Sequence, residues 1–362
     1  MTAIYPGKVP GKPSFHRLQY GYPRPVLESN CVLVTGGAGF LGTHLCHRLL
    51  DRGAEVVCVD DLSTSAPGNV ADLQRRPGLQ FVEHDITSSS GDSRLDRRFD
   101  TVFHLASPAS PPDYLRLPIQ TLRVGAHGTS VALDIAERSG ARLVLASTSE
   151  VYGDPLEHPQ RETYWGNVNP IGPRSVYDEA KRFAEALVLA YHRAGRGNVA
   201  VARIFNTYGP GMRANDGRMV PTFCRQALAD EPITVSGSGQ QTRSLCHVDD
   251  TVAALLALAD ADITGPVNIG NPMELTVLEV AEMIRDLAGS SSPIHYVSAA
   301  QDDPQRRCPD IRLASERLGW EPKVPPEEGL AETVAWFRGR QSGVWPPAAD
   351  PVSPRPPWVN LL

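Results

Sequence analysis

The sequence predicts an α/β fold in which a doubly wound parallel sheet carries helices on both faces and a smaller C-terminal α/β lobe follows it. Two observations lead to this prediction. Short, almost continuously apolar segments alternate with helix-length segments, a pattern typical of parallel strands that are buried on both sides. A glycine-rich stretch, "VTGGAGFLG", also stands where the first of these strands meets the first helix.

The elements of the sheet follow one another from residue 31. The apolar run "CVLVT" (31–35) is predicted to be a strand, the amphipathic segment 41–53 a helix that ends at Gly53, and "EVVCVDD" (55–61) a second strand. Further strands, separated in several places by helix-length segments, are expected at 79–85, 101–106, 142–147 and 199–205.

The pattern changes to shorter elements beyond about residue 210, which predicts the smaller lobe. Its expected strands and helices lie at 233–237, 249–260, 266–270 and 276–288.

Composition excludes several classes of protein. The net charge of −6 argues against nucleic acid as the main partner, because phosphate binding needs a basic face. No run of about 18 apolar residues is present, so no membrane association is expected, and the N-terminus has no apolar region of a secretory signal. The six cysteines are scattered without a C-x-x-C pair, so neither a metal site nor a disulfide framework is indicated, and a reducing cytoplasm fits best.

The glycine-rich stretch predicts a nucleotide site. Gly36, Gly39 and Gly42 allow a tight turn and a close backbone approach, and the N-terminus of the following helix then faces a pyrophosphate. The second strand reaches Asp60, whose carboxylate can accept hydrogen bonds from both ribose hydroxyls and repels a 2′-phosphate. The expected cofactor is therefore NAD rather than NADP, bound to a Rossmann-type domain. Asp85, after the third strand, is a candidate neighbour of the adenine.

Four parts of the chain are expected. Residues 1–29 form an irregular arm and 30–205 the NAD-binding Rossmann domain. Residues 206–338 form mainly the substrate-binding lobe, and 339–362 a Pro-rich tail.

A tyrosine and a lysine in "YDEAK" predict a catalytic pair. Tyr177 and Lys181 are four positions apart and share one face of a helix. A nearby ammonium favours the phenolate, so the tyrosine can act as a general base at neutral pH. Together with the hydroxyl of Thr148, at the end of the apolar run 142–147, the pair predicts hydride transfer from a secondary alcohol.

At this point the chain resembles a known family. "TGGAGFLG", "STSEVYG" and "YDEAKR" are similar to the extended short-chain dehydrogenases/reductases that act on nucleotide sugars. The blocks 104–114, 158–182, 202–220, 237–244 and 301–311 resemble, more narrowly, the UDP-glucuronate decarboxylase (UDP-xylose synthase) family. The resemblance covers roughly residues 30–338.

The resemblance implies an enzyme that binds NAD tightly, oxidises UDP-glucuronate at C4, releases CO₂ from the 4-keto sugar, protonates C5 and reduces C4 again. Thr148 is then expected to hydrogen-bond the C4 oxygen, while Ser149 and Glu150 face the C5–C6 end of the sugar. Glu150 either repels the substrate carboxylate or, if protonated, bonds to it. Arg307 is expected near the same carboxylate, and either Arg307 or a water that it holds takes part in protonating C5. A cytoplasmic homodimer built from the helices near 115–138 and 178–194 is also implied.

The same resemblance assigns the remaining contacts by position. The substrate contacts are Asn206, Arg218, Gln241, Arg243 and Arg307. The cofactor contacts are Gly36, Gly39, Phe40, Leu41, Gly42, Asp60, Asp61, Thr64, Asp85, Ile86, Leu105, Ala106, Ser107, Tyr177 and Lys181.

Three residues depart from the family pattern. Ser236 and His247 stand where tyrosine is common, which leaves uridine and thymidine open as the base, and Gly125 stands where asparagine is usual. A nucleotide-sugar 4-epimerase or 4,6-dehydratase is the nearest alternative. Dehydratases place an Asp–Glu pair after the threonine, and epimerases need no arginine at position 307. A catalytically silent NAD-binding regulator is disfavoured because Tyr177 and Lys181 are both present.

Overall fold

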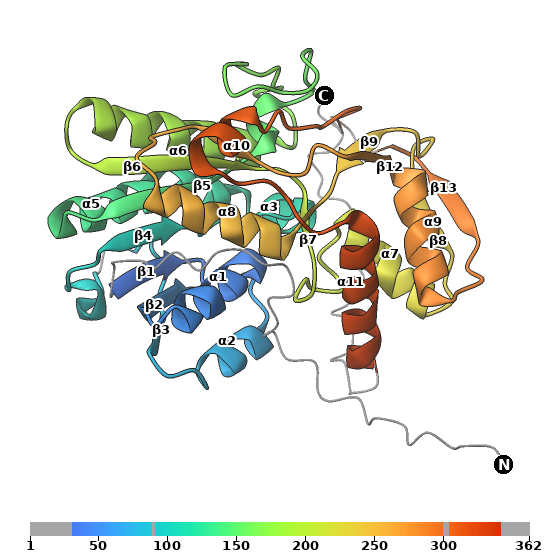
Figure 1. Cartoon of the computed structure of the whole chain (residues 1–362), viewed down its shortest axis with the longest axis horizontal. Coiled ribbons are helices and arrows are strands. Elements are labelled where there is room, and N and C mark those ends of the chain that lie inside the picture. The colour runs from blue at the N-terminus through green and yellow to red at the C-terminus, as the bar shows by residue number, and fades with distance from the viewer. Residues whose placement is uncertain (1–30, 89–90, 300–303, 342–362) are drawn as a thin grey trace.

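The computed structural model describes residues 31–88, 91–299 and 304–341 (Figure 1). The expected N-terminal arm (1–29) lies outside these residues, as does the Pro-rich tail after Gln341. Within the described residues, no helix combines the length and the apolar character needed to cross a membrane.

A seven-stranded parallel sheet forms the centre of the fold, as the sequence predicts. Its strand order, β11-β6-β5-β4-β1-β2-β3, reverses direction at β1, which is the doubly wound arrangement (Figure 1). The strands are β1 (Cys31–Thr35), β2 (Glu55–Asp60), β3 (Leu79–Glu83), β4 (Thr101–His104), β5 (Arg142–Thr148), β6 (Asn198–Ile204) and β11 (Val267–Ile269).

Helices cover both faces of this sheet. Leu45 of α1 and Leu255 of α8 pack in the core on one face, and Leu133 of α5 and Val188 of α6 pack in the core on the other. Apolar burial on both faces explains why the strands read as continuous apolar runs. The helices and helical turns of this part are α1 (Phe40–Asp51), α2 (Pro67–Leu73), η1 (Ser93–Leu95), α3 (Pro111–Arg116), α4 (Pro118–Arg123), η2 (Val124–Gly128), α5 (Thr129–Ser139), η3 (Ser149–Tyr152), α6 (Ser175–Arg193) and α8 (Val248–Asp260).

Two elements from the second half of the chain belong to the central sheet rather than to the smaller lobe. The predicted strand 266–270 is β11, which pairs in parallel with β6, and the predicted helix 249–260 is α8. An apolar pattern shows that such an element is buried but not which core receives it, so the sequence alone could not assign them.

The smaller lobe surrounds its own apolar core, which includes Phe223, Val235, Ile284 and Phe337. Its helices stand side by side at the right of Figure 1. The remaining elements of the second half are β7 (Thr207–Tyr208), α7 (Met219–Leu228), β8 (Ile233–Ser236), β9 (Thr242–Ser244), β10 (Cys246–His247), β12 (Glu274–Thr276), α9 (Val277–Ala288), β13 (Ile294–Val297), α10 (Arg312–Leu318) and α11 (Pro326–Gln341).

Several strands end earlier than the sequence predicts, and the residues left over line the site. The segment 101–106 is a strand only to His104. The next two backbone amides turn toward β1: Leu105 donates to the Thr35 carbonyl at 3.0 Å and Ala106 donates to Thr35 Oγ1 at 3.4 Å. The carboxyl end of the parallel sheet is thereby opened for a ligand.

Candidate active site

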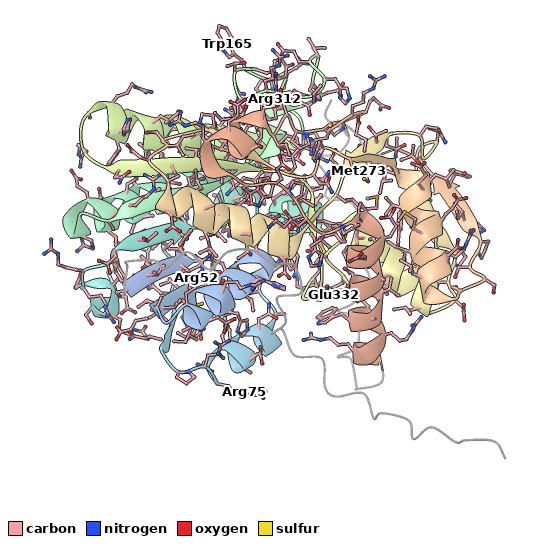
Figure 2. All side chains as sticks on the ribbon, viewed as in Figure 1. Arg52, Arg75, Trp165, Met273, Arg312 and Glu332 are labelled. Carbon is pink, nitrogen blue, oxygen red and sulfur yellow. The ribbon has the colours of Figure 1, made fainter. Side chains whose placement is uncertain are left out.

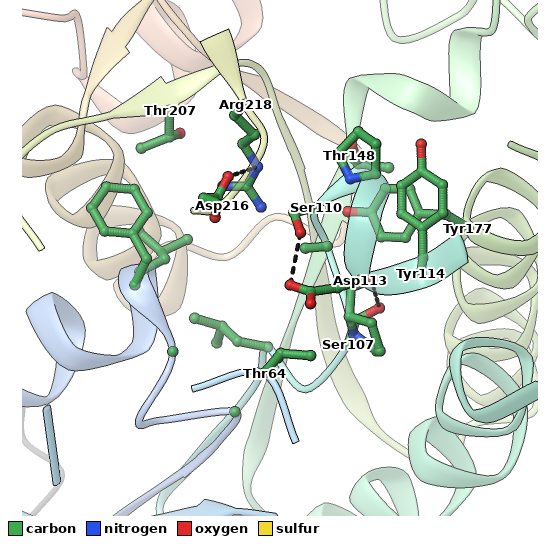
Figure 3. A pocket seen from close by; sticks show the side chains of 18 of the residues that line it. Thr64, Ser107, Ser110, Asp113, Tyr114, Thr148, Tyr177, Thr207, Asp216 and Arg218 are labelled. Carbon is green, nitrogen blue, oxygen red and sulfur yellow. Dashed lines mark hydrogen bonds and ion pairs between the residues drawn. The ribbon is translucent and has the colours of Figure 1, made fainter. Parts of the chain in front are cut away.

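One cavity of about 860 Å³ lies between the central sheet and the smaller lobe. All the residues that the sequence proposes for catalysis, cofactor binding and substrate binding line it. Figure 3 shows part of the wall, with Thr64 and Ser107 on one side and Thr148, Tyr177 and Arg218 on others. Residues from positions 35 to 307 therefore meet at one place.

The glycine-rich stretch lines one end of this cavity with glycine backbone that carries no side chains. Gly36 has a φ of +69°, a left-handed conformation that strongly favours glycine. A Cβ atom on Gly42 would lie 2.2 Å from the Gly36 carbonyl oxygen, and a Cβ atom on Gly36 would lie 2.7 Å from the Ala106 nitrogen. Gly39 caps the N-terminus of α1 without a side chain in the way. Backbone amides and the helix dipole are thus open to a pyrophosphate.

Asp60 ends β2 next to the glycine-rich stretch. Its Oδ2 accepts a hydrogen bond from the Ala38 amide at 3.0 Å, and its Oδ1 accepts from the Leu62 amide and the Ser65 hydroxyl at 2.9 and 3.0 Å. These bonds fix the carboxylate while lone pairs remain for ribose hydroxyls. Burial raises the pKa of Asp60, and the hydrogen bonds act in the opposite direction. The geometry fits the adenosine ribose of NAD.

The proposed catalytic pair sits deep in the cavity. Tyr177 and Lys181 of α6 are both buried. Lys181 Nζ donates to the Ala146 carbonyl at 2.8 Å and lies 5.8 Å from the centre of the Tyr177 ring. Thr148 ends β5, its side chain hydrogen-bonds Tyr177, and Figure 3 labels both side chains on the cavity wall. A hydroxyl, a phenol and an ammonium therefore line the same wall.

Burial is the largest influence on the pKa of Tyr177. Burial raises the pKa of Tyr177 to about 12, the Glu150 carboxylate raises it further, and the bond to Thr148 opposes the shift. Burial also lowers the pKa of Lys181 to about 8, because a charged ammonium is poorly solvated there. The phenol is consequently protonated at neutral pH, and the general-base role of Tyr177 stays a prediction.

Glu150, on the helical turn η3, is held between two arginines. Its Oε2 accepts from Arg174 Nη2 at 2.5 Å, and its Oε1 accepts from Arg307 Nη1. Burial would raise the pKa of this carboxyl group, but the guanidinium charges of Arg307 and Arg174 outweigh it and lower the pKa to about 2. Of the two sequence-based alternatives, the ionised carboxylate is therefore the state present at neutral pH.

Arg307 lines the cavity, and one edge of its guanidinium has no partner among the described residues. The side chain is only 4% exposed, and one of its terminal nitrogens donates to Glu150. Its Nε and Nη2 atoms are buried and have no hydrogen-bond partner among the described residues. A guanidinium edge of this kind is suited to a bidentate carboxylate, and a buried donor without a partner costs roughly 1–3 kcal/mol. A ligand carboxylate would satisfy both nitrogens.

The far wall carries the proposed substrate contacts. Asn206 Nδ2 is buried and has no partner in the described part of the chain. Arg218 precedes the first turn of α7, with its Nε 3.3 Å from Asp216 Oδ1 (Figure 3). Gln241 donates to the Ser236 carbonyl at 2.7 Å, and Arg243 donates to the Thr242 carbonyl at 2.8 Å. Amide and guanidinium donors thus line the wall where a diphosphate is expected.

Three residues that the sequence analysis did not select complete the site. Arg174 binds Glu150, and the Tyr114 ring stacks on Tyr177 with centroids 5.2 Å apart. Asp178, next to Tyr177, is buried, and burial followed by the charge of Glu150 raises its pKa to about 7. The blocks 104–114 and 158–182 contain all three, but nothing in their spacing distinguishes them from solvated residues.

The structure also tests the residues that depart from the family pattern. Ser236 lines the cavity. His247 does not: it is buried under α11, with its ring 5.6 Å from the Tyr208 ring in an edge contact, so its expected place near the base is wrong. Gly125 lies in η2, where a Cβ atom would be 2.7 Å from Ala180, so this glycine allows close packing against α6.

The fold and the cavity define a nucleotide-cofactor enzyme of the doubly wound class. Residues 32–270 match the NAD dependent epimerase/dehydratase family, and the chain belongs to that family.

Relatives of known activity lie within the same group. The chain is 51% identical over 307 residues to UDP-glucuronic acid decarboxylase 1 of Xenopus tropicalis. The matched region covers 85% of this chain and 72% of that protein. The solved structure of a UDP-glucose 4-epimerase of Thermotoga maritima has 29% identity and a TM-score of 0.79, covering 86% of this chain and 99% of the epimerase. A UDP-glucuronic acid 4-epimerase of Bacillus cereus, solved with NAD, has 27% identity and a TM-score of 0.75. The match covers 86% of this chain and 99% of the epimerase.

Proposed function

We propose that this protein is an NAD-dependent UDP-glucuronate decarboxylase that forms UDP-xylose and CO₂. The observation that carries the proposal is the ionised Glu150 bound to Arg307, whose other guanidinium edge has no partner among the described residues, in the cavity that Thr148 and Tyr177 also line. The 51% identity to a decarboxylase of this substrate supports it. Bound NAD⁺ supplies a hydride acceptor for C4 and a positive charge that favours the Tyr177 phenolate.

The first step is oxidation of C4. Thr148 donates a hydrogen bond to the C4 oxygen, and Tyr177 takes the proton of the C4 hydroxyl as the hydride leaves the carbon. Lys181 donates a hydrogen bond to the Ala146 carbonyl of β5. This bond holds α6, which also carries Tyr177, against the sheet. The product is a 4-keto sugar with a carboxylate on C5, which is a β-keto acid.

The second step breaks the C5–C6 bond. The Nε and Nη2 atoms of Arg307 orient the carboxylate, and the negative Glu150 disfavours its charge in the ground state. That repulsion disappears as neutral CO₂ departs, so it favours the transition state. The electron pair of the broken bond moves into the C4 carbonyl and gives an enolate, whose oxygen Thr148 continues to hydrogen-bond.

The last steps restore the enzyme. C5 of the enolate takes one proton, from a water held by Arg307 or from the arginine itself. Tyr177 returns its proton to the C4 oxygen as the hydride comes back to C4. The whole sequence consumes one proton and releases one CO₂, with no net oxidation.

A product assay tests this function. Purified protein is incubated with UDP-glucuronate and NAD⁺, and CO₂ and the sugar nucleotide are followed by mass spectrometry and NMR. UDP-xylose and stoichiometric CO₂ are expected. Recovery of a hexuronate with inverted C4 and no CO₂ would establish a 4-epimerase instead. The thymidine analogue in the same assay determines the base preference that Ser236 leaves open.

We also propose that the protein is a cytoplasmic homodimer. Four large apolar side chains are exposed on neighbouring helices: Leu115 of α3, Ile119 and Leu122 of α4, and Phe183 of α6. An apolar group of this kind is typical of an interface between copies of a chain. All six cysteines are free and buried, as expected in a reducing compartment. Light scattering of wild-type protein and of Phe183→Glu tests the dimer, since the variant should shift it toward monomer.

A further inference from the structure

Three metal-ligating side chains meet outside the cavity described above. His158 lies in the segment after η3, Glu274 begins β12, and Cys308 follows the active-site arginine Arg307. Their ligand atoms all lie within 4.8 Å of one another, and His158 Nε2 is 2.9 Å from Glu274 Oε2. Tetrahedral Zn²⁺ bound to nitrogen, oxygen and sulfur places neighbouring ligand atoms about 3.5 Å apart, so the widest separation must close by about 1 Å and the histidine–glutamate pair must open by about 0.5 Å.

The backbone around these ligands is tied together. The Gln160 amide donates to the Cys308 carbonyl at 2.9 Å, and the Cys308 amide donates back to Gln160 Oε1 at 2.9 Å. Asp310 then donates to the Gln160 carbonyl at 2.9 Å. The segments that carry His158 and Cys308 are therefore held in register, which fixes two of the three ligands relative to each other.

Glu274 is oriented by a partner of its own. Thr242 Oγ1 donates to Glu274 Oε1 at 2.5 Å, and β12 pairs with β9 at the same place. This bond occupies one carboxylate oxygen and directs Oε2 toward His158. Ligands of bound metal ions usually have such an outer hydrogen-bond partner, which fixes their orientation.

The three ligands differ in exposure, so an ion can enter the site from solvent on the side of His158 and Glu274. The side chains of His158 and Glu274 are 31% and 27% exposed, whereas Cys308 is 5% exposed. Met273, beside Glu274 in the chain and labelled in Figure 2, is also exposed. The thiol therefore forms the base of a shallow site, with the imidazole and the carboxylate at its rim.

We propose that His158, Glu274 and Cys308 form a site for a divalent ion of the zinc class, with water as the fourth ligand. The mixture of thiolate, imidazole and carboxylate selects Zn²⁺ or Co²⁺ over Mg²⁺ and Ca²⁺, which take oxygen ligands. The site is separate from the cavity, because none of its three residues lines it.

Binding must displace a proton from the thiol. A free cysteine thiol is mostly protonated at neutral pH and binds an ion as the thiolate. His158 can present Nε2 to the ion by carrying its proton on Nδ1. One proton is thus released for each ion bound, and the affinity rises with pH.

The ion would stiffen the segment that holds Arg307. Cys308 is covalently next to Arg307, whose Nη1 donates to Glu150. Fixing Cys308 to His158 and Glu274 joins this segment to the loop after η3 and to β12. A bound ion therefore stabilises the folded chain and restricts the arginine without touching the substrate.

Cobalt titration tests the site directly. The full chain without an affinity tag is stripped with a chelator and titrated with Co²⁺, while the near-ultraviolet thiolate-to-cobalt charge-transfer band is recorded without substrate. One Co²⁺ per chain is expected to give this band, and Zn²⁺ should abolish it by displacement. Cys308→Ser should lose the band, His158→Gln should weaken binding at least tenfold, and Thr242→Val about tenfold.

A matched cysteine variant provides the control. Cys224→Ser removes another buried thiol, in α7, and should leave the band unchanged. A wild-type chain without the band, or a band that persists in Cys308→Ser, would overturn the proposal. If Cys308→Ser folds poorly, His158→Gln still tests the site, because His158 is partly exposed and its replacement should not disturb folding. Neither outcome bears on whether the protein decarboxylates UDP-glucuronate.

Discussion

The two ends of the cavity are built in different ways. The cofactor end is made by one short stretch of chain, in which Gly36, Gly39 and Gly42 expose backbone amides next to Asp60. The carboxylate end is made by charged side chains that are far apart in sequence, with Glu150 between Arg174 and Arg307.

This contrast separates two means of binding charge. Local backbone geometry suffices for a pyrophosphate, because amide groups and a helix dipole carry only partial charges. Full charges with low solvent exposure require partners brought in by the tertiary fold. Four substitutions probe the contrast, beginning with Tyr177, which lines the same cavity.

Tyr177→Phe should have the largest effect. Loss of the phenol removes the proton acceptor for C4, so kcat should fall about 10³-fold. The ring remains stacked on Tyr114, and the thermal midpoint should hardly change. CO₂ release and nicotinamide absorbance measure the loss. Tyr191→Phe, on the same helix but bonded to Asp134 at the surface, is the control and should retain full activity.

Glu150→Gln should break the carboxylate end alone. The variant is expected to oxidise C4 but to release CO₂ at least about 100-fold more slowly, so that the 4-keto sugar accumulates. Mass spectrometry of quenched reactions detects it. Glu137→Gln, which removes an exposed partner of Arg196, should behave as wild type. Wild-type CO₂ release by the Glu150 variant contradicts the assigned role.

The same substitution changes stability in acid. The pKa of Glu150 is lowered to about 2 in the folded chain, below its value of about 4.3 in an unfolded one. Its ionisation therefore stabilises the fold fully above about pH 4.3, and this contribution is lost as the pH falls toward 2. Denaturant unfolding between pH 6 and 3 should show a smaller loss of stability in Glu150→Gln than in wild type.

Gly42→Ala should damage the cofactor end. The added Cβ would lie 2.2 Å from the Gly36 carbonyl oxygen, so the turn must shift at a cost of about 1–3 kcal/mol. Less NAD should remain bound after purification, as measured by chromatography of the released nucleotide. Gly68→Ala is the control, since a Cβ there meets no atom within 4 Å. Equal NAD content in both variants would contradict the close-approach argument.

Ser236→Tyr should have the smallest effect. A ring added to this cavity wall can stack on the base, which is worth about 1 kcal/mol and lowers KM for the UDP-sugar about fivefold. The ratio of uridine to thymidine substrates measures the change. His247→Gln should leave that ratio unaltered, because His247 lies outside the cavity wall. A changed ratio in the histidine variant would restore the role that the sequence suggested for it.

The features predicted correctly are those that neighbouring residues determine. The central strands, the glycine turn and the shared face of Tyr177 and Lys181 follow from periodicity and spacing. The assignment of β11 and α8 to the central sheet did not follow, because the apolar pattern of an element does not show which core receives it.

The sequence by itself therefore determined the fold class, the cofactor turn and a set of residues that line the cavity, though not Tyr114 or Arg174, since these features depend on backbone conformation and on motifs of a few residues. Only the tertiary structure decided the ionised state of Glu150, the part taken by Arg174, and the exclusion of His247 from the cavity. It also brought His158 and Glu274 to Cys308. Charge and coordination depend on distances between residues that the chain separates by many positions, and folding alone sets those distances.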